Sequence, residues 1–209
     1  MKTQIFRIND LSNEQLGEVA HAIENGAVVA LATDTVYGVA ADAFNETAIA
    51  RIYALKGRPV NIPLQILVGS ITAAQQLAQW NEQAERLARA FWPGALTLIA
   101  KPSEQGNSLL RGFAGLGLRV PKHEGLLQLL QTLHPPLACT SANIHGKPVI
   151  TREEDLCTFC DGQVEYILTD GTLSPIASSV VDLTKAPTLL REGCIPRRAL
   201  ETILKEPLK

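Results

Sequence analysis

The feature that most constrains the fold is the alternation of short, almost wholly apolar runs with stretches of helical periodicity. Runs such as "AVVAL" (27–31) and "ALTLIA" (95–100) are typical of strands buried inside a sheet. Segments between them carry apolar residues three and four positions apart, which predicts helices. The two kinds of segment interleave irregularly, without strict strand–helix–strand units. The pattern predicts an α/β fold, with a mixed sheet and packed helices, in a single domain over residues 1–209.

The local signals place the individual elements. The stretch 12–26 begins with Ser12 as a helix cap and ends with Gly26, and the helix at 46–57 ends with Gly57. Further helices are expected at 72–79, 82–91, 124–133, near 152–158 and from Pro196 to 204. Strands are expected at 27–35, 63–69, 95–100, 116–121, 136–141, 166–170, 178–183 and 188–192. The chain has neither of two common nucleotide-binding motifs, GxGxxG after the first strand or GxxxxGK[ST]. A nucleotide would therefore be bound by a different kind of site.

Charge and hydropathy narrow the class of protein. A net charge of −2 argues against bulk attraction to nucleic acid or to an anionic membrane. No apolar run approaches the roughly 20 residues that span a bilayer, and "MKTQIFRIND" has no hydrophobic segment typical of a signal peptide. We therefore expect a cytoplasmic protein with no membrane partner.

The cysteines do not predict a metal site. Cys157 and Cys160 form a lone CxxC, whereas zinc needs a second pair of ligands. Cys139 and Cys194 lack the spacing and a neighbouring histidine that would supply that pair. We expect reduced, structural thiols and no protein-bound metal.

Polar residues gather where the predicted strands end, as in a cleft built on a sheet. Lys56 and Arg58 lie between a helix end and a strand, on a segment stiffened by Pro59 and Pro63. The other clusters are "TDTVYG" (33–38), Arg119, "TSANIHGKP" (140–148), Ser178 with Ser179, and Arg191. Four cations with hydroxyl and amide groups at such positions predict a pocket for an anion.

Each group also has an ordinary structural explanation. Arg119 can extend to solvent from an edge strand, and Lys56 suits the negative end of a helix. Ser141 and Asn143 suit a turn. None of these explanations accounts for the repeated placement of cations and hydroxyls at strand ends.

Other chemistries have little support in the sequence. His21, His134 and His145 lie in a helix, beside prolines and in a loop, so a Ser–His–Asp hydrolase is not expected. No carboxylates show metal-ligand spacing, although Asp34, Asp170 or Asp182 can hold a metal through water. Cations and hydroxyls without strong acids or bases suit phosphoryl or adenylyl transfer, which needs alignment and charge neutralisation.

Taken in order, the motifs resemble the YrdC-like family, whose known members are L-threonylcarbamoyl-AMP synthases. The matching stretches cover about residues 28–195 and are "TDTVYGVAADA", "KGRPVNIPLQILV", "FWPGALTLI", "GLRVPKH", "CTSANIHGKP", "SSVVDL" and "LLREGCI". The resemblance implies a twisted mixed sheet around a concave, positively charged cleft, in the short form without an extra C-terminal domain.

The resemblance also implies an activity. L-threonine, bicarbonate and ATP, which arrives with Mg²⁺, would give threonylcarbamoyl-AMP and pyrophosphate in a nucleotidyltransferase reaction. The product would go to a tRNA-modification complex that acts on adenosine 37. By motif, L-threonine would be held by Thr35, Arg119, Ser141 and Ser178. ATP would be held by Lys56, Arg58 and Arg191, with Asn143 and the backbone near Cys139, and Lys56 and Arg58 would also be catalytic.

The sequence departs from the family pattern at several positions. Ala32 replaces a proline, Ile62 an asparagine, Leu67 a histidine and Val149 a serine, and Ser179 replaces a threonine. Lost polar contacts are worth about 0.5–1.5 kcal/mol each, so affinities or the substrate can differ. We place Val36 and Leu67 near the methyl group of threonine.

Two alternatives remain open. One is an RNA-binding member of the fold without synthase activity. The other is a relative of the carbamoyl-adenylate domain of hydrogenase maturation proteins, which the absence of accompanying acylphosphatase or zinc-finger sequence disfavours.

Overall fold

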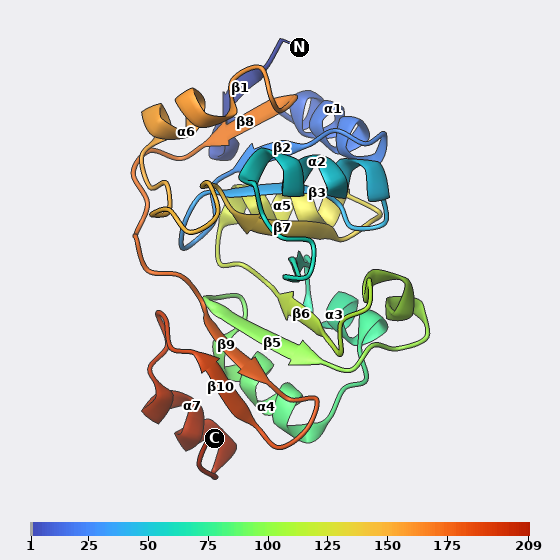
Figure 1. Cartoon of the computed structure of the whole chain (residues 1–209), viewed down its shortest axis with the longest axis vertical. Helices are drawn as coiled ribbons and strands as arrows, with labels where there is room; N and C mark the ends of the chain where they lie inside the picture. Colours follow the sequence, from blue (N-terminus) through green and yellow to red (C-terminus); the bar gives the residue numbers. More distant parts are fainter. Residues whose placement is uncertain (1) are drawn as a thin grey trace.

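The computed structural model describes residues 2–209 (Figure 1). Their strands form one sheet in the order β1-β8-β2-β3-β7-β4-β6-β5-β9-β10. Four neighbouring pairs are parallel and five are antiparallel, so the predicted mixed sheet is confirmed. The strands are β1 Gln4–Arg7, β2 Val29–Leu31, β3 Gly38–Asp42, β4 Gln65–Leu67, β5 Leu96–Ala100, β6 Leu116–Arg119, β7 Leu137–Ser141, β8 Tyr166–Thr169, β9 Ser179–Asp182 and β10 Thr188–Arg191.

The helices pack around this sheet. They are α1 Asn13–Glu24, α2 Glu46–Lys56, α3 Ile71–Leu77, α4 Glu82–Phe91, α5 Glu124–Thr132, α6 Glu153–Cys160 and α7 Arg197–Leu204, with 3₁₀ turns at Ile8–Asp10 and Gln105–Leu109. Figure 1 shows α1, α2, α5 and α6 around the upper strands and α3, α4 and α7 around the lower ones, with β4 and β6 between the two groups. No helix in residues 2–209 is long and apolar enough to cross a membrane.

The capping signals in the sequence do set the helix ends. Ser12 accepts a hydrogen bond from the backbone N–H of Gln15, and the Gln15 side chain accepts from the Ser12 N–H, which completes a capping box. Gly57 ends α2 with φ of 57°, a left-handed conformation that glycine adopts without steric cost. Pro196 precedes α7 as its N-cap.

Two strands were not predicted, β1 and β3. β1 is a short, mostly exposed edge strand that carries Gln4 and Arg7, so no apolar pattern marks it. It exists because it pairs in parallel with β8, about 160 residues away. β3 reads "GVAAD", whose glycine and alanines have weak strand preference. It is buried between β2 and β7, so tertiary pairing decides its conformation.

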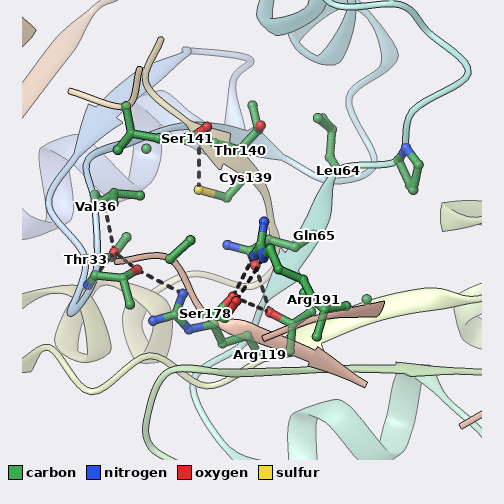
Figure 2. A pocket seen from close by; sticks show the side chains of 18 of the residues that line it. Thr33, Val36, Leu64, Gln65, Arg119, Cys139, Thr140, Ser141, Ser178 and Arg191 are labelled. Carbon is green, nitrogen blue, oxygen red and sulfur yellow. Dashed lines mark hydrogen bonds between the residues drawn. The ribbon is translucent and has the colours of Figure 1, made fainter. Parts of the chain in front are cut away.

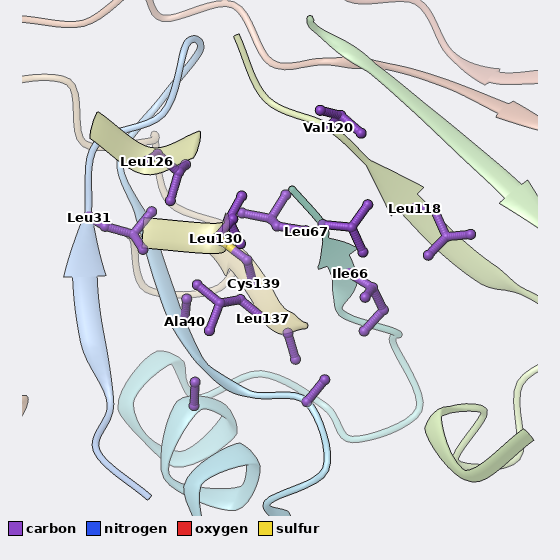
Figure 3. Packing of buried hydrophobic residues seen from close by; sticks show 14 of the residues in the cluster. Leu31, Ala40, Ile66, Leu67, Leu118, Val120, Leu126, Leu130, Leu137 and Cys139 are labelled. Atoms are coloured by element: carbon purple, nitrogen blue, oxygen red, sulfur yellow. The ribbon is translucent and has the colours of Figure 1, made fainter. Parts of the chain in front are cut away.

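The apolar core fills the space between strands and helices. Figure 3 shows its central part, with Leu126 and Leu130 of α5 beside Leu137 and Cys139 of β7, and with Leu118 of β6 on the other side of β4. Leu67 and Leu118 are fully buried there. Large apolar side chains that leave water in this way supply the main driving force for the fold.

Candidate active site

A main cavity of about 270 Å³ opens where the strand ends meet (Figure 2). Its walls come from the segment between β2 and β3, from β4, β5, β6 and β7, and from the residues at β9 and β10. Seven of the nine residues assigned to the substrates by motif line it: Thr35, Arg58, Arg119, Cys139, Ser141, Ser178 and Arg191. The lining includes three arginines and no aspartate or glutamate. The volume lies near the lower end of the usual range for small-molecule sites.

Arg119 forms the floor of the cavity and is held from three sides. It lies at the end of β6, between β4 and β5, and is only 2% exposed, so the edge-strand explanation is wrong. Its guanidinium is 2.5 Å from Asp34 Oδ1 and 3.2 Å from Thr35 Oγ1, and its Nε donates to the Gly94 carbonyl at 3.0 Å. The ion pair with Asp34 compensates the buried charge, so Arg119 is a fixed element of the site.

Arg58 and Arg191 have no carboxylate partner among residues 2–209. Arg58 donates to the backbone carbonyls of Ile62 (3.4 Å) and Pro63 (3.0 Å). Arg191 lies at the exposed edge of the cavity and donates to the Ser178 carbonyl at 3.0 Å and to Ser178 Oγ at 3.1 Å.

The surroundings of Arg58 and Arg191 disfavour the positive charges of their guanidinium groups. Partial burial lowers the pKa of Arg58, and partial burial together with nearby Arg119 lowers the pKa of Arg191. Neither guanidinium has a carboxylate partner among residues 2–209, so an anion that entered the cavity would supply one.

Lys56 and Asn143 do not line the cavity, which changes the role predicted for them. Lys56 is 1% exposed, and its Nζ donates to the Ser141 carbonyl, to the Asn143 carbonyl at 2.7 Å and to Asn143 Oδ1 at 2.9 Å. Burial and the neighbouring Arg58 lower the pKa of Lys56 to about 8, so at pH 7 it is still mainly an ammonium with three protons to donate. Lys56 therefore holds the Ser141–Asn143 loop in place and does not reach into the cavity.

We expect the substitution Lys56→Met to cost about 2 kcal/mol of unfolding free energy, because buried carbonyls lose their donor. Lys56 is only 1% exposed, so water cannot replace the donor that these carbonyls lose. Urea denaturation measures the change, and Lys101→Met at an exposed position is the matched control. Equal stability of the two variants would show that the loop does not depend on Lys56.

Two cavity residues, Thr97 and Gln65, were missed in the sequence. Thr97 Oγ1 lies 3.1 Å from Gln65 Oε1 and 3.0 Å from Ser178 Oγ, so it links β4 to the segment before β9. The available signal was a single hydroxyl inside the apolar run "ALTLIA". Its hydrogen-bond partners, Gln65 and Ser178, lie 32 and 81 residues away in the sequence, so the local sequence does not reveal them.

The apolar positions divide between two cavities. Val36 and Val149 line the main cavity, and the proximity of Val36 to a threonine methyl group stays a prediction. The expectation for Leu67 is wrong, because this side chain is 0% exposed and lines a separate cavity of about 100 Å³ together with Leu130. A histidine restored there would meet the core and not the main cavity.

The sequence did not single out His123. His123 Nε2 lies 3.1 Å from Asp170 Oδ2, so a histidine with a carboxylate partner does exist. Its Nδ1 accepts from the Leu126 N–H at 3.3 Å, which makes it the N-cap of α5. His123 is not among the residues that line the main cavity.

The cysteines are free thiols, and burial raises the pKa of Cys139 and of Cys160 to about 12. Within residues 2–209, no three His, Cys, Asp or Glu side chains gather around a point that could hold a metal ion. Asp34, Asp170 and Asp182 instead contact Arg119, His123 and Thr184.

Comparison with known proteins places this chain in a family. The Sua5/YciO/YrdC family model, described as "Telomere recombination", matches residues 21–193. The chain is 39% identical over 188 residues to the threonylcarbamoyl-AMP synthase of Pyrococcus abyssi, covering 88% of this chain and 55% of that protein. It is 35% identical over 209 residues to the putative threonylcarbamoyl-AMP synthase of Mycobacterium tuberculosis H37Rv, covering 97% of this chain and 95% of that protein.

A solved structure of a relative has a similar fold. The crystal structure of P. abyssi Sua5 complexed with L-threonine superposes with a TM-score of 0.88 at 35% identity, over 99% of this chain and 61% of the other. The chain thus spans little more than half the length of the P. abyssi protein. From the family model and these relatives, we conclude that the chain belongs to the Sua5/YciO/YrdC family.

Proposed function

We propose that this chain is an L-threonylcarbamoyladenylate synthase, a nucleotidyltransferase that uses L-threonine, bicarbonate and ATP. The observation that carries the proposal is the pair Arg58 and Arg191, two cations that have no carboxylate partner within residues 2–209 and that lie at a cavity with hydroxyl groups. The names of the relatives and the L-threonine bound to P. abyssi Sua5 support the choice of substrate. The product would serve the N6-threonylcarbamoyl modification of adenosine 37 in tRNA, through a downstream complex in the cytoplasm.

The proposed chemistry has two steps. The amine of threonine attacks the carbon of bicarbonate, and loss of water leaves a carbamate. A carbamate oxygen then attacks the α-phosphorus of ATP, and pyrophosphate leaves. Mg²⁺ enters bound to the nucleotide, since this hard cation prefers phosphate oxygens and water.

Some of these residues would bind the substrates, and others would hold the binding residues in position. Arg58 and Arg191 would bind the phosphates and stabilise the charge on the departing pyrophosphate. Threonine would lie among Thr35, Ser141 and Ser178, above Arg119. Lys56 and Asn143 would act as positioning residues, because their polar atoms are already engaged within the loop.

Pyrophosphate release with and without L-threonine tests the proposal. We expect release to require L-threonine, with L-serine poorer by about 10–200-fold in kcat/KM, because one methyl group in an apolar niche is worth about 1–3 kcal/mol. Val36 and Val149 are the apolar lining residues proposed for that niche. Equal rates with L-serine would argue against the niche.

The RNA-binding alternative predicts a different outcome of the same experiment. Absence of turnover together with tight tRNA binding would support an RNA-binding protein without synthase activity. Turnover without threonine, driven by carbamoyl phosphate and ATP, would support the carbamoyl-adenylate alternative.

A further inference from the structure

Three loops border the main cavity, and we call them the rim loops. They are residues 57–63, 142–150 and 171–177, and most of their residues are exposed. Figure 1 shows the third of them, between β8 and β9, crossing from the upper strands to the lower ones. The loops also supply lining residues to the cavity, among them Pro63, Val149 and Ala177. Their exposed parts therefore lie around its opening.

Each rim loop exposes one large apolar side chain. Val60 is 75% exposed, Ile144 53% and Ile176 52%. They are half of the six large apolar residues that are exposed in residues 2–209, although the rim loops make up only about a tenth of the chain. Single exposed apolar residues are ordinary on a protein surface, but several that gather around one cavity indicate an interaction surface.

The rim loops also lack acidic side chains. None of the 21 Asp and Glu residues lies on them, whereas Arg58 and Lys147 do. The whole chain has a net charge of −2, so the positive character of the rim loops is local. Charges across an interface are usually complementary, which favours a partner surface that combines acidic and aliphatic groups.

Backbone hydrogen bonds hold the rim loops together. The His145 N–H donates to the Lys56 carbonyl at 2.8 Å, which joins the second loop to the start of the first. The Leu173 N–H donates to the Thr151 carbonyl at 2.8 Å, which joins the third loop to the end of the second. A surface that is already ordered loses little conformational entropy when a partner binds, so this one suits docking.

The composition of the rim loops favours a protein over RNA as the partner. Single-stranded RNA is recognised by aromatic side chains that stack on its bases and by several cations that contact its phosphates. The rim loops contain no Phe, Tyr or Trp, and one of their two Lys and Arg residues, Arg58, is already assigned to ATP. Exposed aliphatic side chains instead suit the apolar centre of a protein–protein interface.

We propose that the rim loops dock the enzyme that consumes the adenylate, through a surface of that enzyme with acidic and aliphatic side chains. The proposal rests on the proposed function and deepens it, since it names the surface at which the product is handed on. That product joins a carbamate to a phosphate in a mixed anhydride, which water hydrolyses. Docking at the opening of the cavity would pass the product on without exposing it to bulk water.

The test uses three variants and the purified tRNA-modification complex of the same organism. The triple variant Val60→Ser/Ile144→Ser/Ile176→Ser removes the exposed apolar groups, and Lys147→Glu reverses one charge. Ile5→Ser is the matched control, because Ile5 is also 52% exposed but lies on the edge strand β1. Surface plasmon resonance measures the Kd of each variant for the complex, and pyrophosphate release measures synthesis.

We expect the wild type to bind the complex with a micromolar Kd and the triple variant to bind it about 10-fold more weakly or worse, as for apolar residues at the centre of an interface. Lys147→Glu should weaken binding by about threefold or more, with a larger effect at low salt. Ile5→Ser should stay within about twofold of the wild type. Pyrophosphate release by the triple variant should be unchanged, because these three side chains do not line the cavity.

The outcomes separate the inference from the proposed function. Threonine-dependent pyrophosphate release without binding to the complex, or equal binding by the wild type and the triple variant, overturns the inference and leaves the function standing. Absence of pyrophosphate release contradicts the function, while binding that only the rim variants weaken leaves the docking surface standing. Tight binding of free tRNA that the triple variant loses would assign the rim loops to RNA and overturn the inference.

Discussion

Replacement of Arg58 or Arg191 by methionine is expected to lower kcat for threonine-dependent pyrophosphate release by about 10²–10³-fold. Each guanidinium would stabilise negative charge that grows as pyrophosphate departs, in a site partly shielded from water. The fold should survive, because both side chains donate only to backbone carbonyls and to Ser178, and neither closes an ion pair. Methionine keeps an apolar stem of similar length, so little packing is lost.

The control is Arg89→Met, which removes a cation from the surface of α4, where the side chain is 75% exposed. It removes one positive charge, as the cavity variants do, but it lies outside the main cavity. A normal kcat for Arg58→Met and Arg191→Met in folded protein would show that the cavity arginines do not act on the phosphates. A similar loss for Arg89→Met would mean that overall charge, and not the cavity, matters.

Loss of Arg119 is expected to destabilise the protein itself. Arg119→Met removes a side chain that is 2% exposed and leaves the Asp34 carboxylate, 11% exposed, without its cation. Breaking a buried ion pair on one side typically costs about 3–5 kcal/mol, because the remaining charge stays buried without compensation. Thr35 and the Gly94 carbonyl lose a donor at the same time. Urea denaturation should therefore show a much lower midpoint.

A double variant distinguishes this cause from simple loss of packing. Arg119→Met with Asp34→Asn removes both charges, so it should recover part of the stability lost in Arg119→Met alone. If the two changes add without any recovery, the ion pair is not what holds Arg119 in the cavity floor.

Most of the fold could be predicted from local sequence, because its helices and buried strands carry their own signals. Ser12 and Gly57 mark helix ends through bonds and backbone angles that depend only on near neighbours. β1 could not be predicted, since its pairing partner β8 lies about 160 residues away, and β3 is paired on one side with β7, about 100 residues away. β1 is mostly exposed at the sheet edge, and β3 consists largely of small residues, so neither shows the apolar pattern of a typical strand.

The candidate site was predictable as a set of strand-end residues but not as a set of contacts. Arg58, Arg119 and Arg191 were all placed at one cavity by the rule that polar groups gather at strand ends. The sequence could not show that Lys56 turns inward to the Ser141–Asn143 loop, a contact across more than 80 residues. It also could not show that Leu67 faces the core, because one apolar residue in a buried strand fits either face.

The most direct test of the account follows two isotopes into one product. The protein is incubated with [¹⁴C]bicarbonate, [α-³²P]ATP and Mg²⁺, with and without L-threonine, and the nucleotides are separated by chromatography. The account predicts a compound that carries both labels in equal amounts and that forms only when L-threonine is present. Labelled AMP without ¹⁴C, or a doubly labelled compound that forms without threonine, would contradict it.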